Sequence, residues 1–400
     1  MNPQSAVALP APRTCPFAPP AEYKRLREET PISKVTLPTG NTAWALTRHE
    51  DIRTMLTDPR FSSDRTAPGF PALVAGQQEI AAGFKPTMIG MDAPEHGPAR
   101  RAVLGEFTVK RMRALQPRIQ QIVDDCIDTM LAGPRPVDLV QALSLPVPSL
   151  VICEQLGVPY ADHEFFQART SRLISRASAV DVRIKARDEL QAYLGDLVTR
   201  KEQEPSDDLL GRQIVKRRED GTYDRADLVG LAFLLLIAGH ETTANMISLG
   251  TLALLEHPED LAALRADPEK TPDAIEELLR YFTIVDSATS RVAKADVEMG
   301  GVLIKAGEGV LVLGNAANHD PDVFDDPDEL NIDRGARHHV AFGFGAHQCL
   351  GQNLARMELQ IVFDTLFRRI PGLKRGAPVD DLPFKDDSGI YGMYEFPVTW

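Results

Sequence analysis

Apolar residues recur at helical spacing over most of the chain between residues 98 and 280. Ile119, Val123, Cys126 and Met130, for example, follow each other at intervals of three and four residues and so share one helix face. The same spacing predicts shorter helices over 49–56, 271–281 and 350–369. Because Cys126 lies on an apolar face, we expect a buried thiol there.

Shorter β-prone runs lie near both ends of the chain. The runs 35–37 and 42–46 flank a turn-forming Pro-Thr-Gly-Asn segment and predict a hairpin. The segments 292–313 and 397–400 are also strand-like, whereas the Gly- and Pro-rich segment 64–91 predicts a long loop. The predicted fold class is therefore mainly α with a minor β-sheet region.

The longest predicted helix begins near Asp227, a residue that suits the N-cap position, and extends to about Leu255. Its first half contains an unbroken run of small and apolar residues over 228–239. A membrane-spanning helix needs about 20 such residues, and this run ends at His240 and Glu241. A buried helix through the centre of a large fold is the favoured interpretation.

The chain has 400 residues and a net charge of −13, from 44 basic and 57 acidic residues. This acidic balance, without a long basic run, argues against nucleic acid as a partner. The four cysteines show no CxxC spacing and the N-terminus has no signal-peptide pattern, so we expect a cytoplasmic protein. Length alone would allow two or three domains.

One cysteine, Cys349, lies in the segment Phe-Gly-Phe-Gly-Ala-His-Gln-Cys-Leu-Gly over 342–351, just before a predicted helix. Glycine permits positive φ and close approach to a flat ligand, and a helix start stabilises a thiolate. No second Cys or His stands at zinc-like spacing. A lone thiolate suits haem iron, where its electron donation favours O–O cleavage. The alternative is a glycine-rich hairpin with a buried cysteine.

A second polar group interrupts the long apolar helix at Gly239, His240, Glu241 and Thr242. A buried acid and hydroxyl cost free energy unless they have partners, and the glycine leaves a groove beside them. This arrangement suits a small polar ligand such as dioxygen. The alternative is a helix kink in which the threonine bonds back to a carbonyl.

Charged residues elsewhere give weaker signals. Glu277 and Arg280 stand at i and i+3 among apolar neighbours and so share one helix face. His96 and Arg100 are cations that would suit the two carboxylates of haem. Each alone is more typical of a solvated surface, and only the set points to a cofactor.

Together these segments resemble the cytochrome P-450 family. Residues 342–351 match its haem-binding signature, Phe-Gly-x-Gly-x-His-x-Cys-x-Gly, at every fixed position, and the motifs keep the family's order over 92–358. Both chain ends are similar to the streptomycete-type soluble branch. The resemblance implies the cytochrome P-450 fold, a triangular helical prism around haem, as a single domain over 1–400. One departure is His319, where relatives usually carry arginine, which puts a local ion pair in doubt.

The resemblance implies a role for each matching position. Cys349 would be the axial ligand of heme b, and Phe342 would pack on the cysteine side of the porphyrin ring. Gly351 would let the following helix lie close to that ring. Glu241 and Thr242 would be the acid–alcohol pair that delivers protons, and the i, i+3 ion pair would be structural. The other implied cofactor contacts are of two kinds. The propionate partners would be His96, Arg100, Arg291 and His347, and the residues beside dioxygen would be Ala238 and Gly239.

The implied reaction hydroxylates or epoxidises a bulky apolar small molecule with O₂. Macrolides, statin-type polyketides, terpenoids and secosteroids are the implied classes, in secondary metabolism or xenobiotic oxidation. Electrons would come from a ferredoxin and an NAD(P)H-dependent ferredoxin reductase, since the chain has no flavin or dinucleotide fingerprint. The resemblance also implies a monomer without a membrane anchor. Substrate-pocket positions carried over from the family are Met88, Ile89, Leu234, Ile237 and Ser287.

Two rival functions stay open at this point. One is a haem-thiolate oxidase that uses peroxide and needs no reductase. The other is a non-enzymatic haem carrier or gas sensor. Glu241 and Thr242 favour true O₂ activation over the peroxide-driven rival, whereas a carrier or sensor would show no spin-state change with an apolar ligand and no product.

Overall fold

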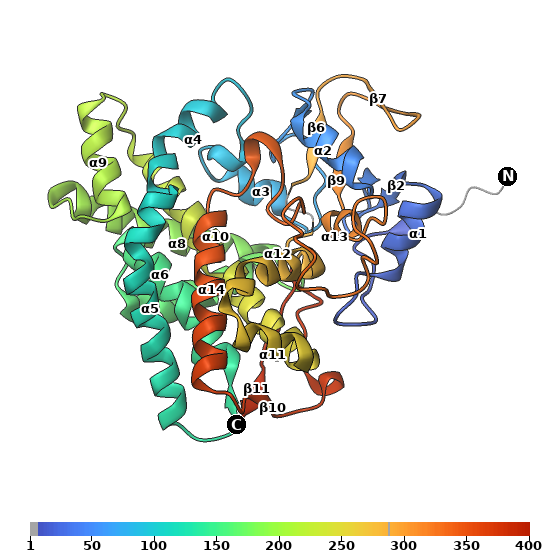
Figure 1. Cartoon of the computed structure of the whole chain (residues 1–400). Coiled ribbons are helices and arrows are strands. Elements are labelled where there is room, and N and C mark those ends of the chain that lie inside the picture. Colours follow the sequence, from blue (N-terminus) through green and yellow to red (C-terminus); the bar gives the residue numbers. More distant parts are fainter. Residues whose placement is uncertain (1–6, 287–288) are drawn as a thin grey trace. The chain divides into compact units, whose positions relative to one another are not determined.

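The computed structural model describes residues 7–286 and 289–400 (Figure 1). Its contacts group into two compact units. Unit 1 comprises Met1–Arg100, Leu279–Asn331 and Ala336–Cys349, and unit 2 comprises Arg101–Leu278, Ile332–Gly335 and Leu350–Trp400. The candidate site residues are divided between the two units, so each unit is described by itself.

Unit 1 is built on a sheet with strand order β1-β2-β3-β9-β6-β4. The antiparallel pair β2 (Ile32–Thr36) and β3 (Thr42–Leu46) confirms the predicted hairpin. β9 (Gly309–Val312) pairs parallel with β3 and antiparallel with β6 (Arg291–Ala293), which brings distant parts of the sequence together. The other strands of the unit are β1 (Val7–Ala8), β4 (Phe61–Ser62), β7 (Val297–Met299) and β8 (Val302–Ile304).

The helices of unit 1 are short. They are α1 (Ala21–Glu29), α2 (His49–Thr57), α3 (Gln77–Ala82), α13 (Gly314–Asn318) and the start of α4 (His96–Leu104). The prediction of an irregular loop over 64–91 was wrong in part, since this segment contains α3 and a single 3₁₀ turn at Met88–Gly90. Gly76, with φ of 74°, immediately precedes α3 and lets the chain turn into it.

Unit 2 is mainly helical. Its helices are α5 (Val109–Ala132), α6 (Pro146–Leu156), α7 (His163–Ile174), α8 (Val180–Gln203), α9 (Leu209–Glu219), α10 (Arg225–Glu256), α11 (Pro258–Ala266), most of α12 (Thr271–Phe282) and α14 (Gln352–Arg369). A small sheet of order β10-β11-β5 joins Lys374–Arg375, Pro397–Thr399 and Val137–Asp138. The helices predicted from apolar spacing over 271–281 and 350–369 are thereby confirmed.

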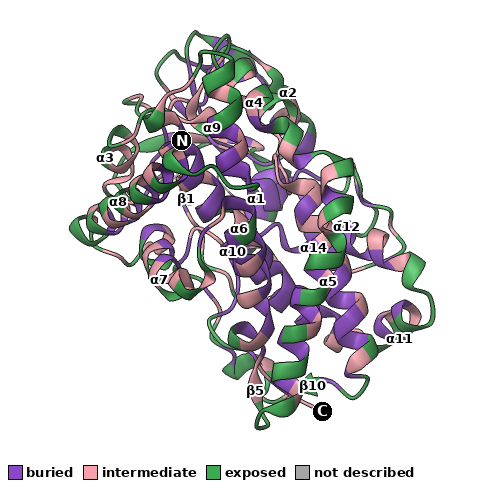
Figure 2. Ribbon diagram, turned by 90° about the vertical axis from the view of Figure 1, so that its left-hand side faces the viewer, coloured by how far each residue is buried: buried purple, intermediate pink, exposed green. Residues whose placement is uncertain are grey.

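The central helix of unit 2 is α10, which lies among the buried parts of the chain in Figure 2. Its N-cap is Asp224, whose side chain accepts a hydrogen bond from the backbone N–H of Asp227 at 3.1 Å, so the prediction of Asp227 as the cap was wrong by one turn. The helix ends at Glu256, two residues before Pro258 begins α11. By length and composition α10 could cross a membrane, but its second half is buried from Thr243 to Leu254, as expected of a core helix.

Candidate active site

The cysteine loop, which we define as residues 340–349, is a closed turn at the edge of unit 1. The backbone N–H of Cys349 donates to the carbonyl of Phe342 at 2.8 Å. Gly343 and Gly345 have φ of 69° and 71°, which confirms that the glycines adopt positive φ. A Cβ on Gly345 would lie 3.0 Å from the carbonyl oxygen of Leu56, so α2 packs directly against the loop. The loop therefore fixes the backbone of Cys349, whose side chain is only partly buried.

The same unit gathers the predicted cations around this loop. The rings of His96 and His347 lie in contact, with centroids 4.0 Å apart and a tilt of 31° between their planes. Arg100 donates to the carbonyl of Gln348 at 2.6 Å, so it lies beside the cysteine itself. Arg291 is 5% exposed and donates to the carbonyls of two preceding residues. The structure therefore brings together all four residues that the sequence assigned to haem carboxylates.

Burial and neighbouring positive charges lower the pKa values of the groups in this cluster. Burial and the nearby Arg291 lower the pKa of His347 to about 3. Burial and the neighbouring Arg65 lower the pKa of Arg291 to about 10. The Nε2 atom of His96 is buried and has no hydrogen-bond partner among the described residues. Buried donors and cations of this kind fit the two carboxylates of a bound haem.

Sequence reasoning missed two members of this cluster. Arg65 acts on Arg291, and the Ser63 hydroxyl lies 3.1 Å from Nε2 of His347. Ser63 is in turn fixed by Asp92, which accepts from its backbone N–H at 2.8 Å. No local signal marks Ser63 or Arg65, because both follow a two-residue strand in an otherwise irregular segment.

Unit 2 supplies a second set of candidate residues on α10. Leu234, Ile237 and Thr242 are only partly buried and Ala238 is exposed, whereas Leu235, Leu236, His240 and Glu241 on the same helix are buried. The Thr242 hydroxyl donates to the Ala238 carbonyl at 2.9 Å, as the kink alternative anticipated. These residues lie at i, i+3, i+4 and i+8 and so form one open, mainly apolar helix face. Such a face suits contact with a flat cofactor and an apolar substrate.

Gly239 has a packing role that the sequence did not indicate. A Cβ at this position would lie 2.8 Å from Cγ1 of Ile152 on α6. The glycine therefore lets α6 and α10 pack closely. The idea that Gly239 also leaves room for dioxygen stays a prediction.

Glu241 points into the interior of unit 2, where it meets a lysine that the sequence did not single out. Lys385 donates to Oε1 of Glu241 at 2.6 Å, and both side chains are less than a tenth exposed. Burial alone would raise the pKa of the Glu241 carboxyl, but the charge and the hydrogen bond of Lys385, with a weaker hydrogen bond from Asn245, lower it. Glu241 is therefore an ionised carboxylate that is held by a hydrogen-bonded cation.

The two residues of the Glu-x-x-Arg motif make structural contacts with distant segments. Glu277 is fully buried and pairs with Arg334 at 3.1 Å. Arg280 is also fully buried and donates to the carbonyls of Asn318, Pro327 and Glu329 at 2.7, 2.8 and 3.1 Å. The role of both residues as an ion pair with each other stays a prediction.

The departure at His319 lies close to this arginine. His319 is 1% exposed, and its Nδ1 atom lies 2.9 Å from the Asn315 carbonyl. Burial and the charge of Arg280 lower the pKa of His319 to about 4. A neutral imidazole thus stands at position 319.

The variant His319→Gln is expected to reduce the loss of stability in acid. Unfolded histidine titrates near pH 6.5, so between about pH 6.5 and 4 the unfolded chain binds a proton that the folded chain refuses. The free energy of unfolding therefore decreases as the pH is lowered through this window. His319 contributes up to about 1.4 kcal/mol per pH unit to this decrease. Urea unfolding at pH 7 and pH 5 should show the variant losing about 2 kcal/mol less than the unaltered chain. Equal losses would contradict a neutral His319.

The remaining predicted pocket residues are less informative. Met88 and Ile89 lie in the 3₁₀ turn that follows α3, and Ile89 is 40% exposed. Ser287 lies outside the described residues. Gly351 precedes α14 with φ of −83°, and a Cβ there would meet no atom within 4 Å among the described residues. The close approach predicted for Gly351 therefore involves no described protein atom.

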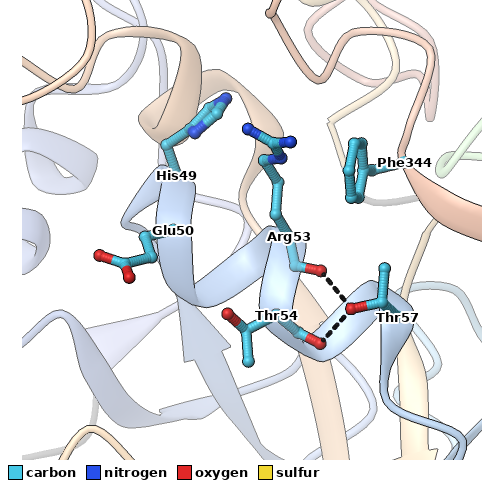
Figure 3. A pocket seen from close by; sticks show the side chains of 6 residues that line it. All are labelled: His49, Glu50, Arg53, Thr54, Thr57 and Phe344. Carbon is cyan, nitrogen blue, oxygen red and sulfur yellow. Dashed lines mark hydrogen bonds between the residues drawn. The ribbon is translucent and has the colours of Figure 1, made fainter.

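A surface pocket of about 300 Å³ lies between α2 and the cysteine loop (Figure 3). Its lining residues are His49, Glu50, Arg53, Thr54, Thr57 and Phe344. The Arg53 guanidinium lies 4.1 Å from the centre of the Phe344 ring. This polar, open site does not suit a bulky apolar substrate.

Comparisons with known proteins found similar sequences and structures over nearly the whole chain. A family model described as Cytochrome P450 matches residues 177–370. The crystal structure of cytochrome P450 MoxA from Nonomuraea recticatena is 63% identical, with a TM-score of 0.92 over 98% of each chain. Cytochrome P450 105A3 of Streptomyces carbophilus is 51% identical over 99% of this chain and 97% of the relative. A vitamin D3 dihydroxylase of Streptomyces griseolus is 48% identical over the same shares of the two chains.

Proposed function

Because this chain belongs to the cytochrome P450 family of haem-thiolate monooxygenases and has its mainly helical fold, we propose that it hydroxylates or epoxidises a bulky apolar small molecule. The haem would be heme b, and the electrons would come from a ferredoxin and its NAD(P)H-dependent reductase. The protein would act as a cytoplasmic monomer and a single domain over 1–400. Macrolides, polyketides, terpenoids and secosteroids are the candidate substrate classes.

The single observation that carries this proposal is the cation cluster around the cysteine loop. Cys349 would ligate the iron as its thiolate. His96, Arg100, Arg291 and His347 would bind the two propionates, and the low pKa of His347, caused by burial and Arg291, would rise when such an anion binds. A structural cysteine hairpin would not need two arginines and two histidines, all buried or half-buried, beside it.

The bound haem would supply the activation of O₂, and the protein residues would supply position and protons. The open face of α10 would contact the substrate through Leu234, Ile237 and Ala238. Thr242 and Glu241 would hold and pass the protons that the reaction consumes. The vitamin D3 dihydroxylase among the relatives supports a substrate with a large apolar body.

The family membership argues against a haem carrier. One experiment distinguishes the proposed O₂-dependent monooxygenase from the other rival, a peroxide-driven oxidase. The purified holoenzyme is titrated with vitamin D3 and followed by its haem absorption spectrum. Product is then sought with ¹⁸O₂, a ferredoxin, its reductase and NADPH. Incorporation of one ¹⁸O atom supports the proposal. Turnover that needs only hydrogen peroxide, with no label from O₂, would favour the peroxide-driven oxidase.

Thr242→Ala is expected to uncouple NADPH consumption from product formation. Positioned proton donors contribute roughly 10²–10⁴ in rate, so product per NADPH should fall about tenfold or more while hydrogen peroxide release rises. The matched control is Thr243→Ala, because Thr243 is the buried neighbour on the same helix. If Thr242→Ala stays as coupled as Thr243→Ala, Thr242 has no part in proton delivery.

A further inference from the structure

The partner of Glu241 comes from a hairpin close to the C-terminus. Phe384 and Met393 form an isolated antiparallel bridge, and the backbone N–H of Lys385 donates to the Gly392 carbonyl at 2.8 Å. Tyr394 closes the hairpin by donating its N–H to the carbonyl of Pro383 at 2.8 Å. The backbone on either side of Lys385 is thus fixed by strand-like pairing.

The hairpin packs closely against α10 because Gly392 has no side chain. A Cβ on Gly392 would lie 1.9 Å from Oδ1 of Asn245, so only glycine lets Asn245 approach this closely. Asn245 donates to the Glu241 carbonyl at 2.9 Å and lies 3.5 Å from its Oε1 atom. Gly392 and Asn245 therefore place Lys385 and Glu241 face to face.

The Lys385–Glu241 pair differs from a surface ion pair in its burial. Both side chains are below 10% exposure, and the Nζ–Oε1 distance is 2.6 Å. Solvent screens such a pair poorly, and removing the lysine would leave a buried carboxylate without its cation. The ionisation of Glu241 must therefore depend strongly on Lys385.

The other titratable groups that act on Glu241 are His240 and Tyr394. Burial lowers the pKa of His240, whose Nδ1 atom lies 2.7 Å from the Leu236 carbonyl, so this imidazole is neutral. The Tyr394 ring lies 5.6 Å from Nζ of Lys385, and its hydroxyl donates to Asp387 at 2.6 Å on the surface. A neutral imidazole and a neutral phenol leave Lys385 to hold the carboxylate charge.

We propose that Lys385 is a positioning residue for oxygen activation, which holds Glu241 as an oriented, ionised carboxylate and sets its affinity for the proton that it passes on. This inference rests on the proposed role of Glu241. Without the ammonium group, Glu241 would bind a proton in the resting protein and release it less readily. The carboxyl group would also lose its fixed direction on α10.

The test measures the protonation of Glu241 directly in the variant Lys385→Met. The reduced, carbon monoxide-bound holoenzyme is diamagnetic, so carboxyl-¹³C glutamate can be titrated by NMR, with the Glu241 signal assigned by its loss in Glu241→Gln. We expect the proton affinity of Glu241 to rise about tenfold or more, which corresponds to a rise of at least about one pKa unit. Lys385→Arg should restore the value of the unaltered chain. Unchanged titration in Lys385→Met would overturn the proposal.

A matched control separates this effect from general loosening of unit 2. Lys201 is equally buried and ion-paired with Asp208, so Lys201→Met removes a similar pair elsewhere. An equal shift of the Glu241 signal in this control would also overturn the proposal. If Lys385→Met does not fold, as judged by loss of the carbon monoxide band, Lys385→Gln removes the charge but keeps a donor, and the same shift is expected.

A second readout links the ion pair to the reaction. The pH profile of product formed per NADPH consumed should move in Lys385→Met and return in Lys385→Arg, whereas loss of packing alone would lower the ratio equally at every pH. If Glu241→Gln leaves this ratio unchanged, the role proposed for Glu241 fails. The NMR titration then still decides separately whether Lys385 controls the carboxylate.

Discussion

Replacing Cys349 with serine is expected to abolish the thiolate-type absorption band of the reduced, carbon monoxide-bound protein and to reduce monooxygenase turnover to background. A serine hydroxyl stays neutral and donates far less charge to iron than a thiolate does. The cysteine loop itself should survive, because it is closed by backbone hydrogen bonds and by glycines at positive φ. The measurement is the reduced carbon monoxide difference spectrum of the purified variant.

The other three cysteines supply the controls. Cys15 is exposed, and burial raises the pKa of the Cys126 and Cys153 thiols to about 11 and about 12. These thiols stay neutral, as expected of structural cysteines. Serine at position 15 or 126 should leave the absorption band in place. An unaltered band in Cys349→Ser would disprove the proposed ligand and with it the site.

The second large effect is expected for Arg280→Ala. The change deletes the donors to three carbonyl groups, of which that of Asn318 is buried and those of Pro327 and Glu329 are partly buried. One orphaned buried acceptor costs about 1–3 kcal/mol, and truncating a fully buried side chain also leaves a cavity. We therefore expect a loss of about 3–5 kcal/mol in the free energy of unfolding. Domains have only about 5–15 kcal/mol in total. Little haem-loaded protein should therefore be recovered, as measured by the carbon monoxide band per mass of chain.

Arg280→Lys tests whether charge alone suffices. An ammonium group cannot reach three separate carbonyls as a planar guanidinium does, so this variant should also be unstable. Arg53→Ala is the control, because Arg53 lies at the edge of an open surface pocket. Its expected cost is within about 0.5 kcal/mol. An Arg280→Ala protein as stable as Arg53→Ala would contradict a structural role for Arg280.

Elements with local signals could be predicted from the sequence. The hairpin at β2 and β3 and the helices α2, α12 and α14 follow from residue spacing alone, and the glycine positions of the cysteine loop follow from its motif. The start of α10 was misplaced by one turn because Asp224 and Asp227 both suit an N-cap. Only the observed hydrogen bond distinguishes the two residues.

Partners that are distant in sequence could not be predicted. Lys385 stands 144 positions from Glu241, and Arg334 stands 57 positions from Glu277. Spacing within one helix predicts contacts only between i and i+3 or i+4 neighbours. The buried charges of Glu241 and Glu277 are instead balanced by residues on other segments of the chain. Arg65 was missed for the same reason. It follows β4, and the pairing of β4 with β6 brings it near Arg291, which is distant in sequence.

The contact between Gly239 and Ile152 has a consequence for anyone who would redesign this catalyst for new molecules. The two positions share a single volume between α6 and α10, so a larger residue at 239 requires a smaller one at 152. Libraries that vary residues along the open face of α10 would then sample mostly misfolded chains if position 239 were included alone. Varying 239 and 152 together would retain the helix packing and let the pocket change shape.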